Sequence, residues 1–144
     1  MIRPFSFSDL ERILQIEQQS FPKSPYDWAT FVNLYYLYPE TFLVYMGKSQ
    51  DQKEEIWGYI IFSQDGHIIS IAVHPQHRRK GIGKELLGRA LNDPLIKKVW
   101  AEVRKNNQGA QAFYLRLGFQ ITGIVPKYYG SEDALIVEWT SPAF

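Results

Sequence analysis

The order of hydrophobic and polar residues predicts a short strand and two helices near the N-terminus. Residues 2–5 contain a proline that a central strand would not tolerate, so they are expected to form an edge strand. Apolar residues recur at helical spacing between positions 10 and 21, and Ser8-Asp9-Leu10-Glu11 has the pattern of a capping box. A second helix is expected to open at Ser24-Pro25, with serine as its cap, and to end near Tyr38-Pro39.

Three strands are predicted to follow these helices, at residues 41–47, 56–63 and 66–73. Polar turns separate them, as expected for consecutive hairpins. Residues 67–73, with the sequence HIISIAV, are apolar almost throughout. Such a run is typical of a strand that is buried on both faces.

Helices and strands alternate in the second half of the chain. One helix is expected over residues 81–92, and a second is capped by Asn107 and ended by Gly118. Strands are expected at residues 97–103, 119–124 and 134–140. The predicted order is βααβββαβαββ. It indicates one α/β (α+β) domain over residues 1–144, with a mixed, mostly antiparallel central sheet of about seven strands and four helices.

The composition narrows the class of protein. The chain has 144 residues, 45% of them hydrophobic and 22% charged, with a formal net charge of +1 and no cysteine. Cysteine nucleophiles, disulfides and thiolate zinc sites are therefore excluded. The longest apolar runs have about six residues, far fewer than the ~20 that cross a bilayer, and the N-terminus lacks an apolar signal segment. We therefore expect a cytoplasmic protein without membrane or nucleic-acid partners.

The segment Arg78-Arg79-Lys80-Gly81-Ile82-Gly83-Lys84 is the most informative part of the chain. It follows an apolar strand and opens a helix, so its glycines let backbone N–H groups approach a ligand beside the positive end of the helix dipole. This arrangement is typical of a site for pyrophosphate or a similar anion. The segment lacks the patterns of a P-loop and of a dinucleotide fingerprint. A capped helix with a solvated basic turn would have the same sequence pattern.

At this segment the chain resembles a known family. The RxxGxG motif that starts at Arg78, placed after Ile71-Ala72-Val73, is similar to the acyl-CoA-binding motif of the GNAT acetyltransferase superfamily. Residues 100–119 (WAEVRKNNQGAQAFYLRLGF) and 127–135 (KYYGSEDAL) resemble the ribosomal-protein-alanine N-acetyltransferases (RimI) and the related N-terminal acetyltransferases of archaea and eukaryotes. The resemblance extends over nearly the whole chain and implies the GNAT fold.

The resemblance implies acetyl-CoA as the cosubstrate and no metal. The pantetheine arm would pair with the backbone of Ile71, Ala72 and Val73, beside a bulge that splays the next strand away. The Val73 N–H would stabilise the oxyanion of the tetrahedral intermediate, and Asn107 would contact the pantetheine arm. The pyrophosphate would be held by the remaining cofactor-binding residues: Arg78, Arg79, Lys80, Gly81, Ile82, Gly83 and Lys84.

The resemblance also implies two catalytic residues. Glu102 stands where the family has its general base, and Tyr114 where it has its general acid. A carboxylate can accept the proton of an α-ammonium group, whose pKa is about 7.7–8.0, and a tyrosine can protonate the departing thiolate. Taken alone, Glu102 would more often be a solvent-facing carboxylate paired with Arg104, and Tyr114 a core tyrosine.

Two aromatic segments are implied to form the walls of a peptide groove. Phe21 and Tyr26 lie between the first two helices, and Tyr128 and Tyr129 lie between the last two strands. The first of these loops has one more proline than the family's usual pattern. The alternative is that these aromatic side chains pack beneath their loops.

The histidines give weaker signals. His74 and His77 have a spacing that two metal ligands could use, but no third ligand is evident. His67 is interpreted as a polar turn residue.

We therefore expect an N-acetyltransferase that acts on the N-terminal α-amine of a protein or peptide, with ribosomal proteins among the candidate substrates. The chain is expected to be a monomer or a weak homodimer. One alternative is acetylation of a small amine, such as a polyamine, amino acid or antibiotic. A polyamine site would need several acids near its mouth, and only Glu40, Glu132 and Asp133 are candidates. Further alternatives are a CoA-binding module without turnover and, last, a nucleic-acid binder at the basic segment.

Overall fold

The computed structural model describes residues 1–142. Its helices and strands follow the order that the sequence predicts. They are β1 (Ile2–Pro4), α1 (Leu10–Ser20), α2 (Trp28–Leu37), β2 (Phe42–Lys48), β3 (Glu54–Phe62), β4 (Ile68–Val73), α3 (Ile82–Leu91), β5 (Lys98–Arg104), α4 (Gln108–Arg116), β6 (Gln120–Val125) and β7 (Ala134–Thr140).

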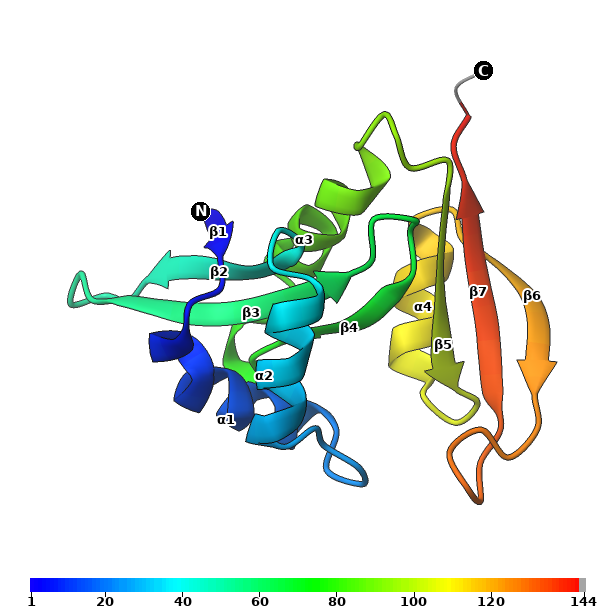
Figure 1. The fold of residues 1–144 in the computed structure, drawn as a ribbon, viewed down its shortest axis with the longest axis horizontal. Coiled ribbons are helices and arrows are strands. Elements are labelled where there is room, and N and C mark those ends of the chain that lie inside the picture. The colour runs from blue at the N-terminus through cyan, green and yellow to red at the C-terminus, as the bar shows by residue number, and fades with distance from the viewer. Residues whose placement is uncertain (143–144) are drawn as a thin grey trace.

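The strands form two antiparallel sheets rather than one continuous sheet. The first has the order β1-β2-β3-β4 and the second the order β5-β7-β6. An isolated parallel bridge between His67 and Trp100 joins them, and the Trp100 N–H donates to the Gly66 carbonyl at 3.0 Å. From this bridge β4 and β5 diverge, as Figure 1 shows. The predicted mixed α/β class with seven strands and four helices is confirmed, and its parallel part is limited to this one bridge.

Gly66 allows the two sheets to meet at the bridge. Its φ is +105°, and a Cβ atom there would lie 1.9 Å from the Lys98 carbonyl oxygen. Any other residue would therefore combine a strained backbone with a direct overlap.

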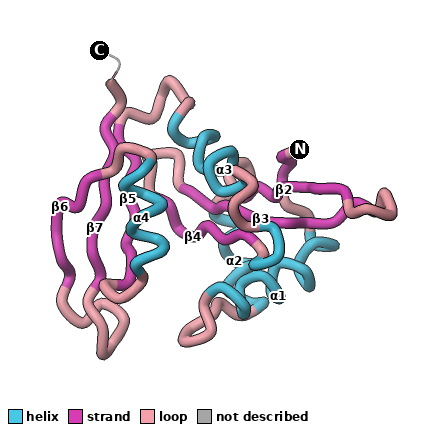
Figure 2. The backbone as a smooth tube through the Cα atoms, turned by 180° about the vertical axis from the view of Figure 1, so that it is seen from behind, coloured by secondary structure: helices cyan, strands magenta, loops and turns pink. Residues whose placement is uncertain are grey.

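Two hydrophobic clusters cover opposite faces of the first sheet. On β3, Tyr59 and Ile61 pack with α1 and α2, whereas Ile60 and Phe62 pack with α3 and the second sheet. This alternation follows from the two-residue period of a strand. Figure 2 shows α3 and α4 from the opposite side, beside the two sheets that they cover.

Two predicted helix starts are wrong. The capping box uses Ser6 and Asp9 rather than Ser8 and Glu11: the Ser6 N–H donates to the Asp9 carboxylate at 2.8 Å, and a short 3₁₀ turn precedes α1. The second helix is capped by Asp27, whose carboxylate accepts from the Thr30 N–H at 2.8 Å.

The prediction that residues 67–73 are buried on both faces is also wrong. Ile71 and Val73 are only half-buried. Beyond the His67 bridge, the edge of β4 that faces away from β3 has no strand partner among residues 1–142. The predicted bulge is present at Ile69, where the register between β3 and β4 shifts.

No helix within residues 1–142 is long and apolar enough to span a membrane.

Candidate functional site

Glu102 lies on β5 just beyond the bridge and is bound by a histidine. The His67 Nε2 atom lies 2.8 Å and 3.0 Å from the two carboxylate oxygens. His67 also stacks on Trp100, with ring centroids 5.2 Å apart and an interplanar angle of 6°. The hydrogen bond to Glu102 raises the pKa of His67, although burial opposes this. The alternative, a pair of Glu102 with Arg104, is absent within residues 1–142, because Arg104 binds Glu132 instead.

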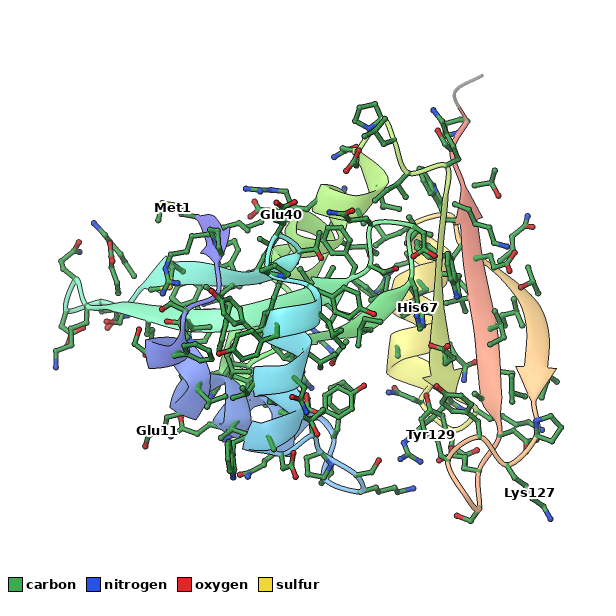
Figure 3. All side chains as sticks on the ribbon, in the orientation of Figure 1. Met1, Glu11, Glu40, His67, Lys127 and Tyr129 are labelled. Atoms are coloured by element: carbon green, nitrogen blue, oxygen red, sulfur yellow. The ribbon has the colours of Figure 1, made fainter. Side chains whose placement is uncertain are left out.

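Three tyrosines from two loops lie within range of the charge of this carboxylate. Burial is the largest cause of the raised pKa values of Tyr26, Tyr128 and Tyr129, and the charge of Glu102 adds to all three. For Tyr129 the pKa rises to about 12. Tyr26 comes from the loop between α1 and α2, and the other two from the loop between β6 and β7. Figure 3 shows His67 beside β5 and Tyr129 further along, near the β6–β7 loop.

Tyr114 lies on α4 and is 5% exposed. Burial raises its pKa, and the nearby Glu102 charge raises it further. No residue among 1–142 forms a hydrogen bond with its hydroxyl group. The Tyr114 ring packs in the hydrophobic cluster next to Phe119, with ring centroids 5.0 Å apart. The ring is therefore part of the core, as the alternative interpretation of this residue describes.

The basic segment forms a turn of left-handed residues before α3. Arg79 has a φ of +66° and Gly81 a φ of +79°. Such a turn directs consecutive N–H groups to one side and makes an anion-binding concavity. The N–H groups of Ile82, Gly83 and Lys84 form the first turn of α3 and therefore have no partner within the helix.

The side chains of this segment point to different partners. Arg78 donates to the Val73 carbonyl at 3.1 Å and to Ser20 Oγ at 3.4 Å. The Lys80 ammonium lies 4.7 Å from the centre of the Trp57 ring. The anion-binding capacity of the turn therefore comes from its backbone more than from these two charges.

The open edge of β4 lies next to this turn. On its other side, Ile71, Ala72 and Val73 pair with β3. An unpaired strand edge presents N–H and C=O groups to which an extended ligand can add as a further strand. A Cβ atom at Gly83 would lie 3.1 Å from the Phe113 ring and 3.8 Å from Val73, so α3, α4 and the end of β4 meet there.

Asn107 caps α4 as predicted. Its Oδ1 atom accepts from the Ala110 N–H at 3.0 Å. No acceptor among residues 1–142 binds the side-chain NH₂ group, so this group can still donate to a ligand.

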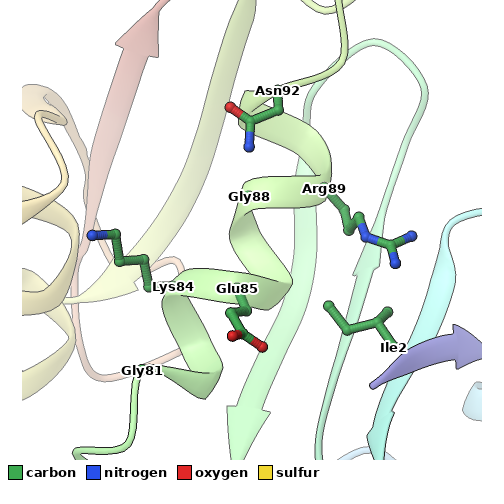
Figure 4. A pocket seen from close by; sticks show the side chains of 7 residues that line it. All are labelled: Ile2, Gly81, Lys84, Glu85, Gly88, Arg89 and Asn92. Atoms are coloured by element: carbon green, nitrogen blue, oxygen red, sulfur yellow. The ribbon is translucent and has the colours of Figure 1, made fainter.

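An open groove of about 740 Å³ runs along the outer face of α3 and begins at the same turn. Figure 4 shows its lining residues: Ile2, Gly81, Lys84, Glu85, Gly88, Arg89 and Asn92. The sequence analysis did not predict this groove.

Sequence reasoning missed His67. It was interpreted as a turn residue, and it holds Glu102. Phe21 and Tyr26 both pack against the cluster beneath α1 and α2, as the alternative for this loop describes, and their role in a groove stays a prediction. No group of three or more potential metal ligands is present within residues 1–142, and His77 instead stacks on Trp57 at 4.1 Å.

Comparison with known proteins identifies the family. The model of the acetyltransferase (GNAT) family matches residues 10–119. An uncharacterized N-acetyltransferase of Methanocaldococcus jannaschii is 35% identical over 145 residues, covering 95% of this chain and 89% of that protein. An N-alpha-acetyltransferase of Saccharolobus solfataricus is 29% identical over 153 residues, covering 94% and 90%.

Solved structures agree with this result. Ard1 from Thermoplasma volcanium has a TM-score of 0.86 and 30% identity, covering 99% of this chain and 98% of that one. The ribosomal-protein-S18-alanine N-acetyltransferase from Escherichia coli has a TM-score of 0.77 and 27% identity, covering 100% and 96%. The chain therefore belongs to the GNAT acetyltransferase family, and it is an acetyl-CoA-dependent N-acetyltransferase.

Proposed function

We propose that this enzyme acetylates the N-terminal α-amine of a protein or peptide. One observation carries the proposal: His67 holds Glu102 where the two sheets meet, within range of tyrosines from two separate loops. An extended chain can lie between two such loops with its amino group at the carboxylate. The relatives named as N-alpha- and ribosomal-protein-alanine N-acetyltransferases support the same class of substrate.

The acidic residues near the site favour a substrate with a single amine over a polyamine. Glu132 accepts from Arg104 and from the Asn106 N–H, both at 2.9 Å. Asp133 accepts from the Lys127 N–H at 2.9 Å. Glu40 lies 3.3 Å from Gln64, in a different part of the fold. None of these three acids adds an unengaged carboxylate beside Glu102, which disfavours a polyamine.

Acetyl-CoA fits the turn before α3 and the open edge of β4. The N–H groups of Arg79 to Lys84 would hold the pyrophosphate, and the backbone of Ile71, Ala72 and Val73 would pair with the pantetheine arm. The Asn107 amide would donate to the same arm. The thioester supplies the electrophile, so the amine nitrogen forms the new C–N bond as the C–S bond breaks.

Glu102 accepts the proton that the amine loses, and His67 shares that proton through its hydrogen bond. The Val73 N–H would donate to the carbonyl oxygen as negative charge develops there. Tyr114 would donate the proton that the departing thiolate needs. Burial raises the pKa of Tyr114, so the hydroxyl is fully protonated at neutral pH but is a weaker acid than an exposed tyrosine.

The test is acetyl-CoA-dependent release of free CoA thiol with two matched peptide sets. One set has free N-termini that differ in the first residue, and the other has blocked N-termini and free lysines. We expect turnover of the free set alone. In Glu102→Gln, kcat should fall by about 10²–10⁴-fold, while CoA binding is retained. Turnover of neither set, or of small amines alone, would contradict the proposal.

A further inference from the structure

Arg104 contacts both loops that flank Glu102. It is the last residue of β5 and lies two residues after Glu102, on the same face of the strand. Its Nη1 atom donates to Glu132 Oε1 at 2.9 Å, and its Nη2 atom donates to Ser24 Oγ at 2.6 Å. The guanidinium carbon lies 4.1 Å from the centre of the Tyr129 ring. The Arg104 side chain is 19% exposed: its bond to Glu132 is partly buried, whereas its bond to Ser24 is exposed.

Each loop is otherwise held within its own part of the fold. In the β6–β7 loop, the Tyr129 N–H donates to the Glu132 carbonyl at 3.0 Å. In the α1–α2 loop, the Tyr26 N–H donates to the buried Glu17 carboxylate at 2.9 Å. No hydrogen bond passes directly from one loop to the other within residues 1–142. Arg104 therefore provides the hydrogen bonds that connect the two loops, and the charge of Lys23 in the first loop also acts on Glu132 in the second.

Only an arginine can make all three contacts at once. Its planar guanidinium group presents one nitrogen to a carboxylate, a second to a hydroxyl, and its face to an aromatic ring. A lysine ammonium at the same place could keep a single charged contact, but it could not span both loops with this geometry.

We propose that Arg104 is a positioning residue for the peptide substrate. It sets the separation of the Ser24 loop and the Tyr129 loop beside Glu102, so that the two loops receive the substrate as one pre-formed groove. The inference rests on the proposed function, because it assumes that a peptide lies between these loops. Pre-organisation lowers the cost of ordering a site on binding, so its loss should weaken peptide binding specifically.

The test measures peptide and acetyl-CoA kinetics for Ser24→Ala, Arg104→Lys and the double variant. Ser24→Ala removes only the contact that connects the loops. We expect the peptide KM to rise about 3–10-fold in Ser24→Ala and about 10–30-fold in Arg104→Lys, since a hydrogen bond to a charged group is lost in each. The double variant should resemble Arg104→Lys, because both substitutions break the same bond. The KM for acetyl-CoA and the pH dependence of kcat should not move.

Arg3→Lys is the matched control. Arg3 also donates from both terminal guanidinium nitrogens, here to the two Asp9 carboxylate oxygens at 2.8 Å, but it lies on β1 rather than beside Glu102. It should leave the peptide KM unchanged even where stability falls. Thermal unfolding of every variant identifies any that fails to fold. Because Ser24 is exposed, Ser24→Ala should leave the Arg104–Glu132 pair intact.

Three results would overturn the inference. The first is an unchanged peptide KM in Ser24→Ala. The second is an equal rise of the KM values for peptide and acetyl-CoA, and the third is additive effects in the double variant. Each of these would leave the proposed function standing, since the wild-type enzyme still acetylates peptides. A wild-type enzyme that acetylates only small amines would overturn both.

Discussion

At the scale of single residues, the behaviour of Glu102 depends on His67. A carboxylate that binds a neutral imidazole can accept one proton and share it with the ring. Because the hydrogen bond that His67 makes to Glu102 raises the pKa of His67, the pair retains a proton at a higher pH than an isolated histidine, whose pKa is about 6.5. The pair must be free of that proton before it can accept another from the substrate.

This dependence predicts the pH profile of kcat. In the wild-type enzyme kcat should fall on the acid side, with an apparent pKa above about 6.5. In His67→Asn the fall of kcat on the acid side should move to lower pH, because no histidine then shares a proton with Glu102. Stopped assays at saturating peptide and acetyl-CoA from pH 5.5 to 9 measure both profiles. An identical acid limb in the two enzymes would exclude His67 from the titrating pair.

Glu17 predicts a pH effect on stability. Its side chain is 2% exposed and accepts hydrogen bonds from the Tyr26 N–H and the Tyr59 hydroxyl. Burial raises its pKa despite these bonds, so the folded state binds the proton more tightly than the unfolded chain does. The stabilising contribution of the protonated group is complete below the unfolded pKa, about 4.3, and is lost as the pH rises through the folded pKa.

Glu17→Gln should therefore gain stability relative to the wild type as the pH rises through this window. Urea unfolding of both proteins between pH 4 and 7 measures the difference in the free energy of unfolding. A difference that stays constant, or that changes in the opposite direction, would show that Glu17 does not titrate with a raised pKa.

At the scale of secondary structure elements, the turn before α3 depends on Gly81. A Cβ atom there meets nothing within 4 Å, so the constraint is its φ of +79° rather than crowding. Gly81→Ala should cost about 1–2 kcal/mol of stability and weaken the N–H arrangement that would hold pyrophosphate. We expect the KM for acetyl-CoA to rise while the peptide KM is unchanged.

Gly88→Ala is the matched control for this element. Gly88 lies within the same helix, and its added Cβ would meet only the Asn92 amide, at 3.4 Å. Here the substitution should stabilise the protein by about 0.5–1 kcal/mol, because alanine favours a helix interior. Thermal unfolding and steady-state kinetics separate the two effects. Equal changes in both variants would contradict a specific role for the turn.

The bounds of two elements show which features of the fold the sequence could predict. The last strand was predicted at 134–140 and forms there, because its residues alternate regularly between two bounded turns. The second helix starts three residues later than predicted. Ser24-Pro25 has the pattern of a cap, but the Ser24 hydroxyl binds Arg104, 80 residues away, and Asp27 caps the helix instead. Local pattern cannot reveal a competing partner so distant in the chain.

At the scale of the whole molecule, the site exists because two sheets meet at one bridge. His67 belongs to the first half of the chain and Glu102 to the second. Their contact requires the Gly66 turn to lie against Lys98, which no periodicity in the sequence indicates. The resemblance to a family supplied the role of Glu102, but the partner of Glu102 became evident only in the three-dimensional arrangement.

Bound CoA should stabilise the folded molecule as a whole. Its expected contacts include β4, the turn before α3 and Asn107. A ligand that binds only the native state at about 100 times its Kd contributes roughly 2.7 kcal/mol. For a chain of this length that corresponds to a rise in Tm of about 5–10 °C. Differential scanning calorimetry measures it, and an unchanged Tm at CoA concentrations that saturate turnover would contradict these contacts.

The central claim is that Glu102 and the two tyrosine loops direct acetylation to an N-terminal α-amine. The most direct measurement uses one peptide that carries both a free N-terminus and an internal lysine. Tandem mass spectrometry of the product then locates the acetyl group. We predict acetylation at the α-amine by the wild-type enzyme and none by Glu102→Gln in the same time. Acetylation at the lysine, or equal modification of both amines, would contradict the claim.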